Sequence, residues 1–329
     1  MQHLRLGRSG LPVSKLCLGT MTFGLQCDEP TSVAILDKAL DGGITFLDTA
    51  DAYPLGGDFS TAGRTEEIIG RYLAGRRDDI VLATKCFMPM GRRPWDAGMS
   101  RKHITSAIDA SLRRLQTDYV DLYQLHFDDR ATPIDETVQA LDDVVRSGKA
   151  RYIGVSNWQA WRLARAVGRT ELLRTVPIVS VQPRYNLLFR AIERDLLPLC
   201  DEVGIGVIPY NPLAGGLLTG KHRRQEDAPD GRFTLGTAGA MYRDRYWHDR
   251  EFDTVELLRP IAAQAGISLT QLAIGWVLAN PTVTAPIVGA SRPEQLDDAL
   301  AAVEHPLPAD LVTRLGELTA EWRRSDAER

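Results

Sequence analysis

The sequence predicts an α/β protein in which eight parallel strands form a closed (β/α)8 TIM barrel. Three observations support this: a length of 329 residues, an eightfold alternation of short apolar runs with amphipathic helical segments, and no composition shift that would mark a domain boundary. A barrel of this kind takes about 250 residues plus insertions. An open doubly wound sheet would give much the same periodicity, so the alternation alone does not separate the two folds. We expect a single domain spanning residues 1-329.

Eight apolar runs of strand length are the candidate barrel strands. In chain order they are Lys15–Gly19, Ile44–Asp48, Ile80–Lys85, Val120–His126, Arg151–Val155, Ile178–Gln182, Gly206–Pro209 and Ala285–Val288. A short N-terminal β-hairpin is expected before them, because Leu4–Leu6 and Pro12–Lys15 flank a turn over residues 7–10.

Amphipathic segments of helix length separate these runs. Residues 101–115 carry apolar residues at spacings of four, four and three, which is one face of a helix. The other candidates are Thr31–Asp41, Ile134–Arg146, Trp158–Val167, Ala191–Val203, Thr254–Ala265, Leu269–Leu278, Pro293–Val303 and Leu311–Trp322. After the seventh strand, residues 211–250 form a long, glycine-rich loop, and a loop of this length in a compact domain is usually functional or disordered.

Composition excludes several classes of protein. The 39 basic and 43 acidic residues give a net charge of −4, which argues against nucleic acid as a partner. The four cysteines, at 17, 27, 86 and 200, show no metal-ligand spacing, and their scatter suggests a reducing compartment. We find no signal peptide and no apolar stretch of the roughly 18 residues that a membrane span needs. We therefore expect a cytoplasmic protein without a metal site.

Polar residues follow or close most of the candidate strands. They are Asp48, Lys85, His126, Asn157, Gln182, Tyr210, Ser291 and Arg292. Alone, each has a common structural explanation: an aspartate can cap a helix, a lysine can be a solvated strand end, and a histidine can belong to the core. Together they indicate a site, because the carboxyl ends of parallel barrel strands share one rim and active sites lie there.

A tyrosine beside a lysine and a carboxylate suggests acid–base chemistry. We expect the Lys85 ammonium to lower the pKa of Tyr53 from its usual value near 10, and Asp48 to keep the lysine charged. Tyr53 could then act as a general acid toward a carbonyl oxygen, with His126 orienting that carbonyl. The chain has no nucleophile elbow of the G-x-S-x-G kind.

Nine segments resemble the aldo-keto reductase family, in the right order and over essentially the whole chain. They are LGTMTFG, GITFLDTADAY, TEEIIGRYL, VLATK, SLRRLQTDYVDLYQLH, GKARYIGVSNW, VQPRYNLL, IPYNPLAGGLLTGK and PIVGASRPEQLDDAL. The resemblance implies the barrel fold and a catalytic tetrad of Asp48, Tyr53, Lys85 and His126. It also implies hydride transfer from NADPH to an aldehyde or ketone, without a metal.

The resemblance also implies a set of cofactor-binding residues. Ser156, Asn157 and Gln182 resemble the groups that hold the carboxamide, Tyr210 the aromatic that stacks on the nicotinamide, and Asn211, Leu213, Gly215, Leu217 and Lys221 the loop over the pyrophosphate. Arg232, Gly289, Ser291, Arg292, Gln295 and Asp298 resemble the adenosine and 2′-phosphate cluster, and Gly19, Thr20, Met21 and Asp48 the floor. We favour NADP(H) over NAD, because arginine suits a phosphate ester. No G-x-G-x-x-G fingerprint follows a strand, so Rossmann-style binding is not supported.

The chain departs from the family pattern mainly on the substrate side. Ala299 stands where many relatives carry asparagine near the adenine, the segment after Tyr53 is longer than the common short turn, and residues 127–129 differ from the usual Arg or Trp. The candidate substrate contacts are Tyr53, Phe87, Trp95, His126, Phe127 and Trp158. These departures leave the physiological substrate open.

Three other functions remain open at this point. A close variant is reduction of a nucleotide-linked keto- or enoyl-sugar. A second is a cofactor-binding regulatory subunit, because the family includes potassium-channel β subunits. A third is a lyase or aldolase that uses Lys85 as a Schiff-base amine, which the neighbouring Asp48 and Tyr53 argue against. The expected partner is a small-molecule carbonyl compound, and the resemblance leaves both monomers and homo-oligomers open.

Overall fold

The protein, in a computed structural model that describes residues 1–224 and 231–324, is built on an eight-stranded parallel sheet. The strands lie in the order β10-β3-β4-β5-β6-β7-β8-β9. Their bounds are β3 Cys17–Gly19, β4 Phe46–Asp48, β5 Val81–Cys86, β6 Val120–Leu125, β7 Ala150–Ser156, β8 Ile178–Gln182, β9 Gly206–Val207 and β10 Ile287–Gly289. Each overlaps one of the eight expected strands.

The two edge strands of this sheet meet, which distinguishes a closed barrel from an open sheet. The Thr284 N–H donates to the Val207 carbonyl at 2.8 Å, and the Ile287 N–H donates to the Pro209 carbonyl at 2.8 Å. These bonds join β10 and the segment leading into it to β9 and the residues that follow it. The prediction of a (β/α)8 barrel is therefore confirmed.

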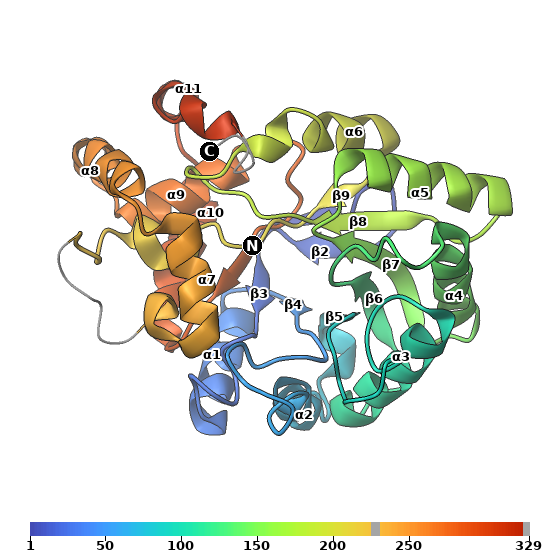
Figure 1. Cartoon of the computed structure of the whole chain (residues 1–329). Coiled ribbons are helices and arrows are strands. Elements are labelled where there is room, and N and C mark those ends of the chain that lie inside the picture. The colour runs from blue at the N-terminus through green and yellow to red at the C-terminus, as the bar shows by residue number, and fades with distance from the viewer. Residues whose placement is uncertain (225–230, 325–329) are drawn as a thin grey trace.

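Helices surround the strands on the outside, as Figure 1 shows. Their bounds are α1 Glu29–Asp41, α2 Arg64–Tyr72, α3 Arg101–Leu115, α4 Ile134–Arg146, α5 Ala160–Leu173, α6 Leu196–Val203, α7 Gly236–Tyr246, α8 Asp249–Gln264, α9 Leu269–Leu278, α10 Asp297–Glu304 and α11 Ala309–Leu318. Local sequence explains their starts and buried faces. Helix α3 begins after Ser100, whose hydroxyl accepts a hydrogen bond from the His103 N–H, and it buries Ile104, Ile108 and Leu115.

Several helical segments differ from the expectation. The predicted helix Pro293–Val303 is η5 (Pro293–Leu296) followed by α10, and the predicted helix Leu311–Trp322 is divided between α11 and η6 (Ala320–Arg323). Helix α2 was not expected, because it is short and begins after Gly63 without a side-chain cap. The segment 191–203 is not one helix but the short η2 (Ala191–Glu193) followed by α6. The long connection after β9 carries the 3₁₀ segments η3 (Ala214–Thr219) and η4 (Arg232–Thr234), then α7. Residues 225–230 of this predicted loop lie outside the described residues.

The predicted N-terminal hairpin closes the amino-terminal end of the barrel. Strands β1 (His3–Arg5) and β2 (Pro12–Ser14) pair antiparallel. Leu6 in the turn and Val13 are fully buried and pack in one cluster with inward side chains of the barrel, among them Cys17, Phe46 and Ile208. This apolar plug leaves the opposite, carboxyl-terminal end for polar groups.

All four cysteines are buried and none forms a disulfide. Cys17 lies in β3, Cys86 in β5 and Cys200 in α6, and Cys27 precedes α1. Burial raises the pKa of each thiol.

Within residues 1–224 and 231–324, no single helix has the length and apolarity that a membrane crossing needs. Helices α8 and α9 meet that requirement only when taken together, and they are bent by 92° at the break between them.

Candidate active site at the carboxyl ends of the strands

The centre of the site is a buried ion pair between neighbouring strands. Asp48 ends β4, and the register pairs it with Ala83 of β5. Lys85 lies two residues beyond Ala83 and so points to the same, inward side of the sheet. Its Nζ lies 2.6 Å from Asp48 Oδ2 and donates to the Thr49 carbonyl at 2.8 Å. Neither charged side chain exposes more than 3% of its surface, so the pair is held by the protein rather than by solvent.

Two glutamines hold the other oxygen of Asp48. Gln182 donates to Asp48 Oδ1 at 2.9 Å, and Gln124 donates to it at 3.0 Å. The carboxylate is thereby fixed in one orientation toward Lys85. Our sequence reasoning missed Gln124. A signal for it existed, because Gln124 precedes His126 by two residues and therefore shares its strand face.

Tyr53 lies beside this pair. Lys85 Nζ donates to the Tyr53 hydroxyl oxygen at 3.4 Å. We expected the ammonium to lower the pKa of the phenol, but the net shift is upward. Burial raises the pKa of Tyr53 more than Lys85 lowers it, and Asp48 adds to the rise. Tyr53 is therefore protonated at neutral pH, with a cation next to its oxygen.

Lys85 itself is held in the charged form. Burial lowers its pKa, but Asp48 and Tyr53 raise it more, so the net pKa of Lys85 lies above its usual value. A free-amine lysine would need the opposite shift.

His126 completes the group as a neutral imidazole. Its ring lies 5.8 Å from the Tyr53 ring, between centroids, at 78°. Burial, and then the Lys85 charge, hold the pKa of His126 well below its usual range. Its Nδ1 is buried and has no hydrogen-bond partner among the described residues. A neutral ring keeps one N–H for donation.

The predicted substrate contacts divide into two groups. Phe127 stacks on His126 at 5.1 Å and lies 5.6 Å from Phe87, so these rings form an aromatic surface next to the tetrad. Trp158 is 3% exposed and donates from its indole N–H to the Phe127 carbonyl, so the structure covers its ring. Trp95 is 47% exposed and lies beside Arg93 and Lys102 instead.

The predicted carboxamide-binding residues also lie together at this rim. The Ser156 hydroxyl donates to the Gln182 carbonyl. Asn157 donates to the His126 carbonyl at 3.0 Å, and the Tyr210 hydroxyl donates to Asn157 Oδ1 at 2.8 Å. This network connects the ends of β7 and β8 to the tetrad.

The predicted floor and adenosine residues follow the strand register. Gly19 pairs with Asp48 on one side and with Gly289 on the other. The Thr20 hydroxyl donates to the Asp48 carbonyl at 3.0 Å. Among the remaining predicted residues, Met21, Leu213, Gln295 and Asp298 are partly exposed, Ser291 and Arg292 are exposed, and Leu217 is buried. Gln295 accepts from the Ser291 N–H at 2.8 Å. Ala299, the departure near the adenine, is buried in α10.

The segment after Tyr210 combines exposed backbone with donors that lack a partner. Gly215 and Gly216 both adopt positive φ, at +70° and +102°, which brings bare backbone to the surface of the loop. Counting partners among the described residues, Asn211 Nδ2 and Arg232 Nη1 are buried donors without an acceptor. Unpartnered buried donors are uncommon and point to an acceptor from a ligand. Lys221 adds a further cation at the same loop.

One buried carboxyl group near the site takes no part in these contacts. Asp51 is fully buried, and neither of its carboxyl oxygens has a partner within the described part of the chain. Burial, and then Glu66, raise the pKa of Asp51 well above its usual value. Burial thus favours the protonated form of Asp51.

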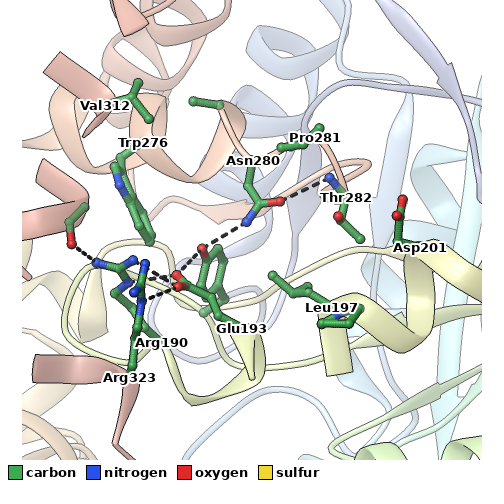
Figure 2. Close-up of a pocket in the computed structure, with 14 residues that line it drawn as sticks. Arg190, Glu193, Leu197, Asp201, Trp276, Asn280, Pro281, Thr282, Val312 and Arg323 are labelled. Carbon is green, nitrogen blue, oxygen red and sulfur yellow. Dashed lines mark hydrogen bonds and ion pairs between the residues drawn. The ribbon is translucent and has the colours of Figure 1, made fainter. Parts of the chain in front are cut away.

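A separate cavity of about 580 Å³ lies among the outer helices, and none of the tetrad residues lines it. Figure 2 shows Arg190, Glu193 and Arg323 gathered at one side of it. Glu193 lies 2.7 Å from Arg190 and 2.9 Å from Arg323, and the Tyr185 hydroxyl donates to it at 2.8 Å. These groups satisfy one another, so the cluster fixes η2 against the C-terminal segment.

No group of three or more His, Cys, Asp or Glu side chains that could hold a metal ion occurs in residues 1–224 and 231–324. The fold and the site together define a (β/α)8-barrel protein with a buried group of Asp48, Lys85, Tyr53 and His126 at the carboxyl rim. The family profile described as the Aldo/keto reductase family matches residues 15–320. The chain belongs to the aldo/keto reductase family and is an oxidoreductase of carbonyl compounds.

Similar proteins include both enzymes and channel subunits. The uncharacterized oxidoreductase YrpG of Bacillus subtilis is 41% identical over 326 residues, covering 97% of this chain and 96% of its own. A probable voltage-gated potassium channel subunit beta of Arabidopsis thaliana is 41% identical, covering 92% of each chain. L-glyceraldehyde 3-phosphate reductase of Escherichia coli is 36% identical, covering 93% of this chain and 88% of its own.

Proposed function

We propose that the protein reduces an aldehyde or ketone to the alcohol, with NADPH as the hydride donor and Tyr53 as the proton donor. The observation that carries this proposal is the placement of the Lys85 ammonium 3.4 Å from the Tyr53 hydroxyl, while Asp48 holds the lysine at 2.6 Å. A positioned cation next to a neutral phenol stabilises the phenolate that forms once the proton has left.

The residues at the rim fit the cofactor. When bound, NADPH supplies the hydride. Ser156, Asn157 and Gln182 offer side-chain and backbone polar groups for its carboxamide, and Tyr210 offers a ring for its nicotinamide. The loop over residues 211–221 offers bare backbone and unpartnered donors for its phosphates. Arg292 and Arg232 are suited to the 2′-phosphate, because a guanidinium donates in a fork that matches phosphate oxygens.

Each member of the tetrad has a separate task in this mechanism. Tyr53 holds the proton, because its raised pKa keeps the phenol protonated. Lys85 stabilises the developing phenolate, and Asp48 keeps Lys85 charged and in place. His126 is neutral and donates an N–H to the carbonyl oxygen, which fixes the substrate near Tyr53. The proton thus moves from Tyr53 to the carbonyl oxygen.

The substrate is a small carbonyl compound that fits beside the aromatic surface. One relative is named as a reductase of L-glyceraldehyde 3-phosphate, which is an aldehyde. The aromatic surface of Phe87 and Phe127 in this chain suits an apolar or planar group attached to the carbonyl. Reduction of a nucleotide-linked keto- or enoyl-sugar remains the alternative substrate class, and a substrate panel separates the two.

A second candidate function is that of a cofactor-binding regulatory subunit. Its support is the name of two relatives, the probable potassium channel β subunits of Arabidopsis thaliana and rice, at 41% and 40% identity. Turnover discriminates between the two functions. A regulatory subunit would bind the cofactor but turn over no member of an aldehyde and ketone panel.

The use of Lys85 as a Schiff-base amine receives no support from the site. The lysine is paired with Asp48, and its pKa is raised rather than lowered.

The first experiment is a fluorescence titration with NADPH and NADH, followed by turnover of a carbonyl panel by the wild type and Tyr53→Phe. We expect binding of NADPH in preference to NADH. We expect Tyr53→Phe to lose about 100-fold or more in kcat, because general acid catalysis contributes at least this much. Its Kd for NADPH should stay within about threefold of the wild-type value, because the ring is retained.

Tyr119→Phe is the matched control. Tyr119 precedes β6 at the opposite end of the barrel, between the guanidinium groups of Arg77 and Arg151, so loss of its hydroxyl should not affect turnover. Near-wild-type turnover by Tyr53→Phe would show that Tyr53 is not the proton donor. Failure of the wild type to bind either nucleotide would refute the proposed function.

A further inference from the structure

His222 is a buried polar side chain next to the proposed phosphate loop. It follows Lys221 directly after η3 and is 4% exposed. Both of its ring nitrogens are buried, and neither has a hydrogen-bond partner in residues 1–224 or 231–324. An imidazole always carries at least one N–H, so a donor is left without an acceptor. Buried polar groups normally have partners, which makes His222 an exception that needs an explanation.

The ring is fixed by its aromatic neighbours. Phe233 lies 5.0 Å from it, between centroids, at 84°, and Trp247 lies 5.5 Å from it at 72°. The two edge-to-face contacts set the plane of the imidazole. They contribute no acceptor for its N–H.

The free edge of the ring faces two residues that have no side chain. A Cβ placed on Gly216 would lie 3.6 Å from His222 Nε2, and one placed on Gly231 would lie 3.9 Å from Cε1. Gly216 also has a φ of +102°, which side chains rarely adopt. The same Cβ on Gly216 would lie 3.9 Å from Lys221 Cε. His222 and Lys221 therefore border one patch of bare backbone.

The charged groups of the described residues around this ring are mostly cationic. Lys221 is the residue before His222, and Arg292, which follows β10, is close enough to lower the pKa of Lys221. Arg232 belongs to η4, and Arg243 of α7 lies over the Trp247 ring. On α8, the carboxylates of Asp249 and Asp253 are paired with Arg224, and Glu251 between them is buried. Tyr242 of α7 lies against Phe233. Burial, and then Lys221, lower the pKa of His222 to about 4.

We propose that His222 is a ligand of a phosphate group of the bound nicotinamide dinucleotide, and that its ring takes up one proton from solvent when the dinucleotide binds. This inference rests on the proposed function, because it needs a dinucleotide in the rim. The acceptor for the orphaned N–H is a phosphate oxygen. The negative charge of the phosphate then favours the imidazolium, which the surrounding cations disfavour while the site is empty of anions.

Proton uptake makes the affinity depend on pH. Above about pH 4 the free protein holds His222 neutral. Between this pKa and the higher pKa of the ring in the complex, each unit of increase in pH therefore weakens dinucleotide binding by as much as tenfold. The same coupling applies to the diphosphate, which NADPH and NADH share, or to the 2′-phosphate, which only NADPH carries.

Calorimetric titration of the full chain at pH 6 tests the inference, in two buffers of different ionisation enthalpy, MES and bis-Tris. The probes are NADPH and NADH, and the proteins are the wild type, His222→Phe and His222→Asn. Phenylalanine keeps the packing against Phe233 and Trp247 but cannot donate or titrate. Asparagine can donate but cannot titrate. His305→Asn, on the surface after α10, is the matched control.

We expect the wild type to take up more protons on binding than either His222 variant, and His222→Phe to bind about tenfold more weakly at pH 6. The 2′-phosphate itself titrates near pH 6 and also takes up protons. The difference in proton uptake between the wild type and each variant therefore gives the contribution of the His222 ring. An effect with both nucleotides assigns the contact to the diphosphate, and an effect with NADPH alone assigns it to the 2′-phosphate.

The inference is wrong if both His222 variants fold, by circular dichroism, and match the wild type in Kd and in proton uptake. In that case the proposed function still stands, because the wild type has bound the dinucleotide. If the wild type binds neither nucleotide, the proposed function fails, and the role of His222 fails with it.

Discussion

At the scale of single residues, Arg292 and Lys221 stand out as two cations held close to each other. Partial desolvation of its ammonium, and then Arg292, lower the pKa of Lys221. Lys221 and Arg292 are both exposed and come from segments far apart in the sequence. Like charges placed together are unfavourable without a counter-charge, and an anionic ligand between them supplies one.

Arg292→Ala should weaken NADPH much more than NADH. We expect the Kd for NADPH to rise by about 10-fold to 100-fold, because a charge-assisted contact to phosphate contributes about 1.5–3 kcal/mol. The Kd for NADH should rise by less than about threefold. Fluorescence titration measures both, with Arg146→Ala on the outer face of α4 as the control. Equal weakening of both nucleotides would remove Arg292 from the 2′-phosphate site.

The sequence predicts the positions of the tetrad but not all of its surroundings. Asp48 and Lys85 can be placed at strand ends because apolar runs stop at them, and the strand register then brings them together. The raised pKa of Tyr53 could not be predicted, because it depends on how much burial outweighs one neighbouring charge. His222 was missed for the same kind of reason, because its burial depends on Phe233 and Trp247 further along the chain.

At the scale of elements, α2 is held against its neighbours by one buried acid and one glycine. Glu66 is fully buried, accepts from the Thr84 hydroxyl of β5 at 2.6 Å and lies 2.7 Å from Arg114 of α3. Gly70 lies at the closest approach of α2 to α3, where an added Cβ would meet the Arg114 carbonyl oxygen at 2.3 Å. The contact is with backbone, which cannot move aside as a side chain can.

Gly70→Ala and Gly168→Ala should change stability in opposite directions. At Gly70 the helices must separate, and overpacking of this kind costs about 1–3 kcal/mol. Gly168, in the middle of α5, has no atom within 4 Å of the added Cβ, so alanine should stabilise its helix by about 0.5–1 kcal/mol. Urea unfolding measures both free energies. A neutral or stabilising Gly70→Ala would contradict the close packing of α2 and α3.

The elements were predictable where a pattern repeats over many residues. The eight barrel strands and α3 and α4 follow from apolar periodicity. Helix α2 has nine residues and no side-chain cap, so its start carries no local signal. Helix α7 begins at Gly236, at a φ of +48°, and follows a glycine-rich segment, so local sequence gave no reason to expect a helix. Such helices depend on tertiary packing rather than on propensity.

At the scale of the whole molecule, buried titratable groups set how stability depends on pH. Burial lowers the pKa of His126, His222 and His103, and it raises that of Asp51. A histidine whose pKa is lowered by folding does not reduce the unfolding free energy above about pH 6.5. Its destabilising effect grows as pH falls from about 6.5 toward the pKa of the ring in the folded protein. A buried aspartic acid with a raised pKa reduces the unfolding free energy more and more as pH rises above about 3.9. Between about pH 3.9 and 6.5, a fall in pH therefore lowers the unfolding free energy through the three histidines and raises it through the one aspartate.

The unfolding free energy should therefore fall as pH decreases from about 6.5. His222 alone should account for about 3 kcal/mol between pH 6.5 and 4, since one pH unit is about 1.4 kcal/mol per group. Guanidinium unfolding of the nucleotide-free protein at several pH values measures the slope. His222→Asn should flatten it, and His305→Asn on the surface should not. An unchanged slope in His222→Asn would show that the ring is charged or solvated in the folded protein.

The closure of the barrel could be inferred only through the family resemblance. Alternating strands and helices fit an open sheet equally well, because the difference lies in a few backbone hydrogen bonds between residues 207–209 and residues 284–287. Those bonds involve no side-chain pattern, so they leave no mark on the sequence.

The reactivity of the four buried cysteines reports how often the folded chain opens locally. A thiol reagent reacts with exposed thiolates, and burial here both shields each sulfur and raises its pKa. Modification of the folded protein therefore proceeds through transient opening. Because Cys17 and Cys86 lie in barrel strands and Cys200 lies in an outer helix, the rates of modification at separate peptides compare how often the wall of the barrel and its outer layer come apart.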